Sequence, residues 1–127
     1  MTFIPMPAAA GAHICSEGNG SISREPITLK SGNGVLVAGS VLGRITAAGA
    51  DFGKYGPYNN AAADGRQAAA GVLFAGVDTT SADARGVGHV RLCEVYASRL
   101  AWASGTSDAD KTAAYADLAA ANIIARA

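Results

Sequence analysis

The sequence predicts an α+β fold: a small, mainly-β, barrel-like domain with a C-terminal helix and a flexible N-terminal arm. Short apolar runs separated by glycine-rich turns between residues 25 and 102 indicate strands. An alanine-rich segment after Ser107 indicates a helix. The first 24 residues show no hydrophobic periodicity, which is typical of a terminal arm. A chain of 127 residues has the length of one domain. We therefore divide it into an arm, residues 1–24, and a domain, residues 25–127.

The arm is expected to become ordered on a partner. Its turn signal is Asn19-Gly20, and its apolar residues are scattered: Phe3, Ile4, Met6 and Ile14. A disordered tail is the alternative, and the isolated apolar residues favour the arm that binds a partner.

The first strands of the domain follow from short apolar patterns. Ile27 and Leu29 alternate with polar residues, which places them on one face of a strand. Gly32-Asn33-Gly34 supplies residues that can adopt positive φ in a tight reversal. Residues 35–37 are expected to form a short buried run. Residues 41–45 form the next apolar element, in which Gly43 marks a bulge or a close backbone approach.

The middle of the chain is expected to alternate long loops with short strands. Residues 47–71 are rich in glycine and form an irregular connection, and such a connection usually carries function or contacts a partner. Residues 72–74 form a strand, and residues 79–88 form a polar surface loop. In residues 89–93, Val90 and Leu92 are expected to share one face of a strand, while His89, Arg91 and Cys93 share the other.

The last segment is expected to be a helix that continues through Ala125. Ser107 and Asp110 have the spacing of a capping box, and Asp108 suits the positive end of the helix dipole. Alanine appears on every side of the helix, so the sequence does not identify the face that packs.

Charge and composition exclude several classes of function. Ten basic and ten acidic residues give zero net charge, whereas nucleic-acid binding requires a positive excess. The N-terminus lacks the basic start and continuous apolar core of a signal peptide, and no run reaches the length of a membrane span. We therefore expect synthesis in a cytoplasm, free thiols at Cys15 and Cys93, and no contact with nucleic acid or membrane.

No motif indicates catalysis or a cofactor. The pairs His13-x-Cys15 and His89-x₃-Cys93 are the nearest approach to a zinc site, but their spacing matches no common zinc module. A nucleophile elbow and a P-loop are both missing from the sequence, and the glycine pair at residues 32 and 34 lacks the third glycine of a dinucleotide fingerprint. The sequence therefore predicts a protein that is not an enzyme and has no cofactor or metal.

Several short motifs resemble the lambda-like phage head decoration proteins. Residues 39–46, GSVLGRIT, are similar to the family stretch AG-x-x-LG-x-IT, and Asp64-Gly65-Arg66-Gln67-Ala68 resembles its loop before an apolar strand. The resemblance covers about residues 24–124, and it rests on the order and spacing of these motifs. The chain departs from it at Ala103, where the lambda member has proline after the corresponding tryptophan.

The resemblance implies a homotrimer that binds the major capsid protein on the outside of an expanded icosahedral head. Its trimers would occupy three-fold and quasi-three-fold positions and stabilise the virion against internal DNA pressure. The expected capsid contacts are Ile14, Ile22, Ser23 and Arg24, and the expected trimer or surface contacts are Tyr55, Tyr58 and Trp102. A soluble carbohydrate- or ligand-binding β-module, with these three aromatic residues as stacking platforms, is the alternative. Against that alternative, Trp102 alone is more typical of a core residue.

Overall fold

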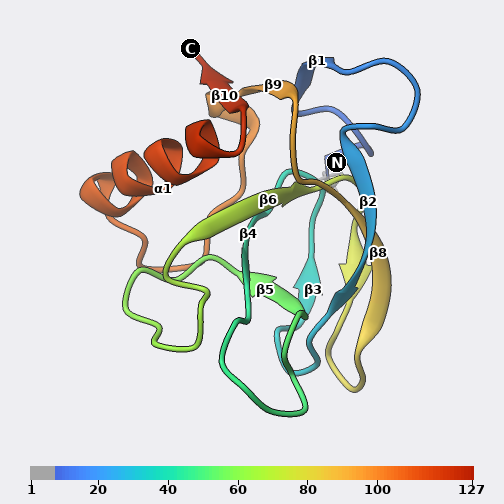
Figure 1. Ribbon diagram of the computed structural model, residues 1–127, viewed down its shortest axis with the longest axis vertical. Helices are drawn as coiled ribbons and strands as arrows, with labels where there is room; N and C mark the ends of the chain where they lie inside the picture. The colour runs from blue at the N-terminus through green and yellow to red at the C-terminus, as the bar shows by residue number, and fades with distance from the viewer. Residues whose placement is uncertain (1–7) are drawn as a thin grey trace, which may run out of the picture.

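A computed structural model describes residues 8–127, and they form short strands and one α-helix (Figure 1). The elements are β1 (Ile14–Glu17), β2 (Arg24–Leu29), β3 (Val35–Leu36), β4 (Val41–Arg44), β5 (Tyr55–Pro57), β6 (Ala69–Leu73), β7 (Val77–Asp78), β8 (Ala84–His89), β9 (Cys93–Tyr96), a 3₁₀ turn (Ala97–Arg99), α1 (Asp108–Ala120) and β10 (Ile123–Arg126). Phe3, Ile4 and Met6 lie outside the described residues.

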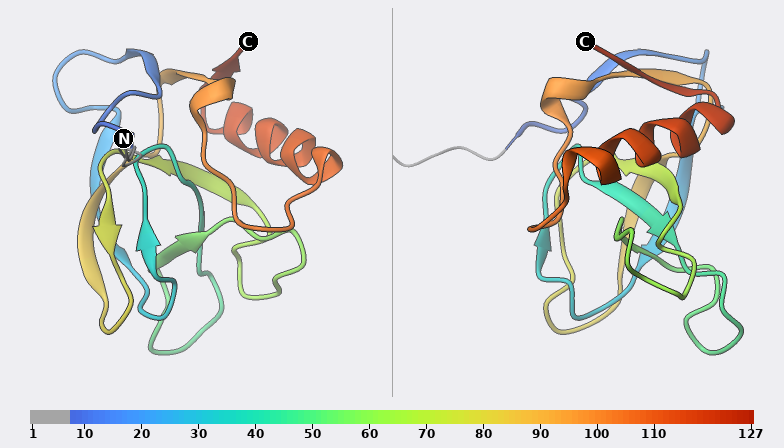
Figure 2. Two further views of the ribbon diagram at one scale, coloured as in Figure 1. Left: turned by 180° about the vertical axis from the view of Figure 1, so that it is seen from behind. Right: turned by 90° about the vertical axis from the view of Figure 1, so that its left-hand side faces the viewer.

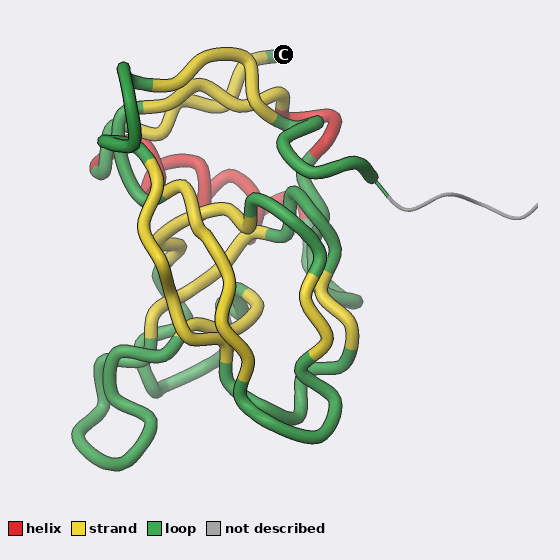
Figure 3. Tube along the Cα trace, turned by 90° about the vertical axis from the view of Figure 1, so that its right-hand side faces the viewer, coloured by secondary structure: helices red, strands yellow, loops and turns green. Residues whose placement is uncertain are grey.

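Five strands close into a barrel in the order β2-β5-β4-β6-β8. A three-stranded sheet, β1-β9-β10, lies across one end of the barrel, and α1 packs between β10 and β6 (Figure 2). Figure 3 shows the same layers, with the small sheet above the helix and the barrel below it. The predicted fold class, a mainly-β barrel with a C-terminal helix, is confirmed.

The barrel has its own apolar core. Ile27 and Leu29 point inward from β2, as their alternation predicts, and both are buried. They pack with the other buried residues of this cluster, Leu36, Leu42 and Leu73. Burial of each of these large side chains contributes about 1.5–3 kcal/mol to folding.

Residues 79–88 are not a polar loop throughout, because β8 begins at Ala84. β8 pairs antiparallel with β2 along its whole length, from Arg24 opposite His89 to Leu29 opposite Ala84. The other connection expected to be irregular, residues 47–71, contains β5 and the start of β6. Val35, expected in a buried run, is 67% exposed.

The expected strand over residues 89–93 is also wrong. β8 ends at His89, and β9 begins at Cys93 after a turn in which Leu92 has a φ of 51°. Leu92 is exposed in this turn, while His89 and Cys93 on either side of it are both buried.

The helix begins as predicted but ends earlier. The Ser107 side chain accepts a hydrogen bond from the Asp110 backbone N–H, and the Asp110 carboxylate accepts one from the Ser107 N–H, which completes the capping box. α1 ends at Ala120, and Asn122 takes a left-handed φ of 61° before β10 pairs in parallel with β9. Asparagine tolerates this conformation better than most residues, so the chain turns there instead of continuing as a helix to Ala125.

Part of the predicted arm is built into the domain. β1 pairs antiparallel with β9, with Ile14 opposite Val95 and Glu17 opposite Cys93. The Gly11 N–H donates to the Phe74 carbonyl at 2.9 Å. The proposed boundary between arm and domain at residue 24 therefore remains a functional prediction, and it does not mark the start of ordered structure.

Candidate functional site

The loop that joins β1 to β2 presents an apolar surface at the sheet end of the molecule. Ile22 is 50% exposed and Leu92 is 44% exposed. The two lie close together, because a Cβ added to Gly18 would contact both side chains. Arg91 donates from Nη1 to the Ile22 carbonyl at 2.8 Å and from Nη2 to Glu25 at 3.1 Å, which places charged groups at the rim of the apolar pair. An exposed apolar pair with a charged rim is a common contact surface for proteins.

Ser23 stabilises this loop through hydrogen bonds of its buried side chain. Its side chain is fully buried, and its Oγ accepts a hydrogen bond from the Gly18 N–H at 2.8 Å and donates one to the Leu92 carbonyl at 2.7 Å. The Ser23 hydroxyl thus fastens the loop carrying Ile22 to the turn carrying Leu92. In this conformation the side chain faces the interior of the protein.

Arg24 joins β1, β2 and the barrel. Its guanidinium pairs with Glu17 at 2.8 Å and lies 4.2 Å from the centre of the Phe74 ring. Hydrogen bonds from Arg24 and then from His89 lower the pKa of the Glu17 carboxyl below its usual value. Ile14 is half-buried in β1, on the same segment as Glu17. The four predicted arm residues therefore gather at one end of the molecule, with Ile22 the most exposed of them.

Two of the three predicted aromatic contacts are packed together. Tyr58 is 1% exposed, and its ring meets Trp102 edge-on with centroids 6.2 Å apart. Trp102 is half-buried and also meets Tyr115 of α1 at 5.7 Å. Burial, followed by the nearby charges of Asp117 and Asp110, raises the pKa of Tyr58. Its hydroxyl lies 3.1 Å from the Asp110 carbonyl, to which it donates.

Tyr55 lies apart from this pair, on β5 of the barrel. Its ring packs against the barrel core, and burial raises the pKa of its hydroxyl. It lines an open groove of about 520 Å³ together with Arg44, Glu25 and Arg91. The structure therefore does not bring Tyr55, Tyr58 and Trp102 together as one surface.

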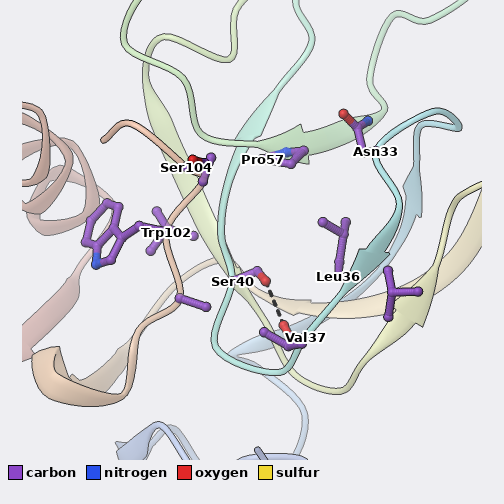
Figure 4. A pocket seen from close by; sticks show the side chains of 11 residues that line it. Asn33, Leu36, Val37, Ser40, Pro57, Trp102 and Ser104 are labelled. Carbon is purple, nitrogen blue, oxygen red and sulfur yellow. Dashed lines mark hydrogen bonds between the residues drawn. The ribbon is translucent and has the colours of Figure 1, made fainter. Parts of the chain in front are cut away.

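A second hollow, of about 320 Å³, lies between β3, β4, β5 and residues 101–104 (Figure 4). Leu36 and Pro57 line its apolar side, and the Ser40 hydroxyl is occupied by a 2.7 Å hydrogen bond to the Val37 carbonyl. In Figure 4 the Trp102 indole points away from Leu36 and toward the helix. Trp102 lines this hollow, but its ring packs against Tyr58 and Tyr115.

The two histidines lie close together, but their cysteines do not join them in a metal site. His13 and His89 are both buried, with ring centroids 5.7 Å apart. Cys15 is exposed and Cys93 is buried, and both thiols are free. Burial, with a smaller effect of the Glu17 charge, raises the pKa of the Cys93 thiol to about 11. Across residues 8–127, no group of three or more histidine, cysteine, aspartate or glutamate side chains is arranged to hold a metal ion.

The sequence does not predict the exposure of two apolar residues, Phe52 and Leu92. Phe52 is 57% exposed at the opposite end of the barrel, where the Arg44 guanidinium lies 5.5 Å from its ring centre. The sequence signal that could have identified Phe52 is its position as an aromatic residue inside the loop-rich connection of residues 47–71. Leu92 was assigned to a strand face because its positive φ leaves no pattern in the sequence.

None of the helices within residues 8–127 is long and apolar enough to span a bilayer. No curated protein and no solved structure gives a significant match to this chain. The family model of the bacteriophage lambda head decoration protein D matches residues 4–123, nearly the whole chain. The chain therefore belongs to the bacteriophage lambda head decoration protein D family, whose members are structural components of the phage head.

Proposed function

We propose that this protein binds the outside of the expanded icosahedral head as trimers and stabilises the shell against the pressure of packaged DNA. The trimers occupy three-fold and quasi-three-fold positions, and their partner is the major capsid protein. The family match over residues 4–123 is the observation that carries the proposal. The protein is made in the host cytoplasm, and it acts by attachment, without catalysis or a cofactor.

The capsid-binding surface is assigned to the arm and to the end of the molecule where the arm enters the fold. The exposed pair of Ile22 and Leu92 lies at this end. Apolar area of this kind gains free energy when a partner covers it. Ser23 and Arg24 position the loop, and Ile14 aligns β1 beside it.

Trimer formation allows the protein to stay bound to the head even if each copy binds weakly. Three equivalent copies present three arms, so binding of one raises the effective concentration of the others. Zero net charge removes a general repulsion between copies. Tyr55 and Trp102, both half-buried in one copy, are assigned to trimer contacts, and the buried Tyr58 supports Trp102 from below.

Co-sedimentation with expanded and unexpanded heads tests the proposal. We expect saturable binding to expanded heads at three copies per three-fold position, and little binding to unexpanded heads. Expanded heads that carry the protein should also withstand heating better than bare heads. Equal binding to both forms, or no gain in heat resistance, would contradict a stabilising role.

A pair of matched variants locates the binding surface. Ile22→Asp places a charge in the exposed apolar pair and should weaken head binding by roughly tenfold or more, equivalent to about 1.4 kcal/mol. Phe52→Ser removes a similarly exposed apolar side chain at the other end of the barrel and should leave binding unchanged. The reverse result would place the capsid-binding surface at the Phe52 end.

Deletion of residues 2–8 tests the arm while leaving the ordered contacts intact. The deletion keeps Gly11, whose N–H bonds to Phe74, and keeps all of β1. We expect an unchanged far-UV spectrum and weaker head binding. Unchanged binding would remove residues 2–8 from the proposal while leaving the Ile22 surface in it.

No observation favours the carbohydrate-binding alternative. Stacking on a sugar needs exposed rings, but Tyr58 is 1% exposed and the half-buried Trp102 makes T-shaped contacts with Tyr58 and Tyr115. Tyr55 lies on a different part of the barrel.

A further inference from the structure

The two histidines of this chain form a buried pair where the N-terminal segment meets the barrel. His13 immediately precedes β1, and His89 is the last residue of β8. Their side chains are 1% and 0% exposed, and their rings meet at an interplanar angle of 81° with centroids 5.7 Å apart.

Within residues 8–127, three of the four ring nitrogens of this pair have no hydrogen-bond partner. They are Nδ1 and Nε2 of His13 and Nδ1 of His89. The fourth, Nε2 of His89, lies 2.7 Å from the Glu17 carboxylate. A neutral imidazole has one N–H donor and one acceptor nitrogen, so both polar groups of His13 are buried without compensation.

The charged and titratable groups around the pair come from each neighbouring element. Glu17 lies on β1 against His89, and Arg24 of β2 pairs with Glu17. Cys93 of β9 is buried beneath this group, and Arg99 donates from Nη1 to the Ala12 carbonyl. Glu17 is the only carboxylate of this set, and it is already bonded to both Arg24 and His89. A proton on His13 would therefore create a buried positive charge with no carboxylate of its own.

The pKa values agree with this geometry. Burial, and secondly the proximity of His89, lowers the pKa of His13 from 6.5 to about 4. Hydrogen bonds from Arg24 and then from His89 lower the pKa of the Glu17 carboxyl.

We propose that the His13–His89 pair is an acid-sensitive latch, in which protonation of His13 releases residues 8–17 from a barrel that remains folded. The segment is also held by the antiparallel pairing of β1 with β9, by the hydrogen bond from Ser16 to Glu94, by the ion pair of Glu17 with Arg24 and by main-chain hydrogen bonds. The Tyr96 N–H donates to the His13 carbonyl at 2.8 Å, and the Gly11 N–H donates to Phe74. The barrel is closed by β2 and β8 without any strand from this segment.

The direction of the effect follows from proton linkage. The latched form binds fewer protons than the released form, because its His13 pKa lies below that of a solvated histidine. The latch is therefore fully effective above pH 6.5 and weakens as the pH falls toward 4. Since each pH unit in this interval changes the equilibrium constant tenfold, the interval from 6.5 to about 4 corresponds to roughly 300-fold.

Hydrogen exchange on the free full-length protein at pH 7.5 and pH 4.5 tests the latch. After correction for intrinsic exchange rates, peptides that cover residues 9–18 should open about a hundredfold more readily at the lower pH. Peptides from β4 and β6 should keep their protection. Equal opening at both values, or an equal loss of protection in the barrel, would overturn the proposal.

A variant and a direct titration identify the responsible group. His13→Leu replaces the ring with an apolar side chain and should make opening of residues 9–18 independent of pH in this interval. Persistence of the acid-induced opening in this variant would assign it to another group and overturn the proposal.

Because the chain has only two histidines, an NMR titration of the unaltered protein can follow His13 directly. A His13 titration near pH 4 supports the latch, whereas one at 6.5 overturns it. The test involves no capsid, so its outcome is independent of the proposed function.

Discussion

Gly43 lies where the backbone of β4 closely approaches the main chain at Arg66. The register between β4 and β6 shifts between Leu42 and Gly43, which makes the bulge that the sequence predicts. A Cβ at this position would lie 2.5 Å from the Arg66 Cα and 2.7 Å from the Arg66 carbonyl oxygen. The expected close backbone approach is therefore confirmed as well. The contact is with main chain, which cannot rotate away as a side chain can.

Gly43→Ala should therefore destabilise the domain by about 3 kcal/mol, because either β4 or the chain at Arg66 must move. Gly32→Ala is the matched control. Gly32 has a φ of +85° and open space around it, so an alanine there meets backbone strain alone, about 1 kcal/mol. Urea unfolding of both variants separates the two costs. Similar losses of stability would show that the Arg66 contact relaxes freely.

The secondary-structure elements differ in how far their sequences predict them. The start of α1 was predictable because a capping box is a local pattern, and Ile27 and Leu29 were predictable because alternation marks a strand face. β8 escaped prediction because Gly86 and Gly88 weaken the strand signal. A Cβ on these glycines would lie 3.1 Å from Leu29 and 3.0 Å from Ile27. Glycine is used there because β2 fills the narrow barrel with large side chains, and that reason becomes visible only when the two strands are paired.

The residues of the candidate site also differ in how far the sequence predicts their positions. The family resemblance implies the arm residues, and they gather at one end because β1 returns to pair with β9. The burial of His13 against His89 leaves no local pattern, since His13 lies just before β1 and His89 ends β8, and these segments meet only in the folded protein. Tyr58 and Trp102 were recognisable as aromatic residues, but the sequence could not reveal that Tyr58 lies beneath Trp102.

The capping box of α1 leads to a prediction at the scale of an element. Ser107→Ala removes the side chain that accepts from the Asp110 N–H and should destabilise the domain by about 1 kcal/mol. Because α1 packs on β10 and β6, fraying of its first turn loosens packing as well as the helix itself. Ser104→Ala, an exposed serine before the helix, is the control and should change stability by less than about 0.5 kcal/mol. Thermal unfolding followed by circular dichroism measures both; equal effects would mean that the cap contributes nothing specific.

At the scale of the whole molecule, two apolar cores share the same strands. Val41 faces the core beneath α1, and its neighbour Leu42 faces the barrel core. Val72 and Leu73 divide in the same way on β6. Successive residues of a strand point to opposite faces, so β4 and β6 form a wall between the cores. Loss of β4 and β6 would therefore expose the buried residues of both cores.

This shared wall predicts a single cooperative unfolding transition, even though the latch segment can open locally. Leu118→Ala in the helix-side core and Leu29→Ala in the barrel core should each cost about 2–5 kcal/mol, because both leucines are fully buried. Trp102 fluorescence reports the helix side and far-UV circular dichroism reports the helix and strands together, so their midpoints should coincide in the unaltered protein and in both variants. If Leu118→Ala moved only the fluorescence transition, the helix and small sheet would unfold as a separate unit. Coincident shifts would instead mean that β4 and β6 transmit a loss of packing from either core to the whole domain.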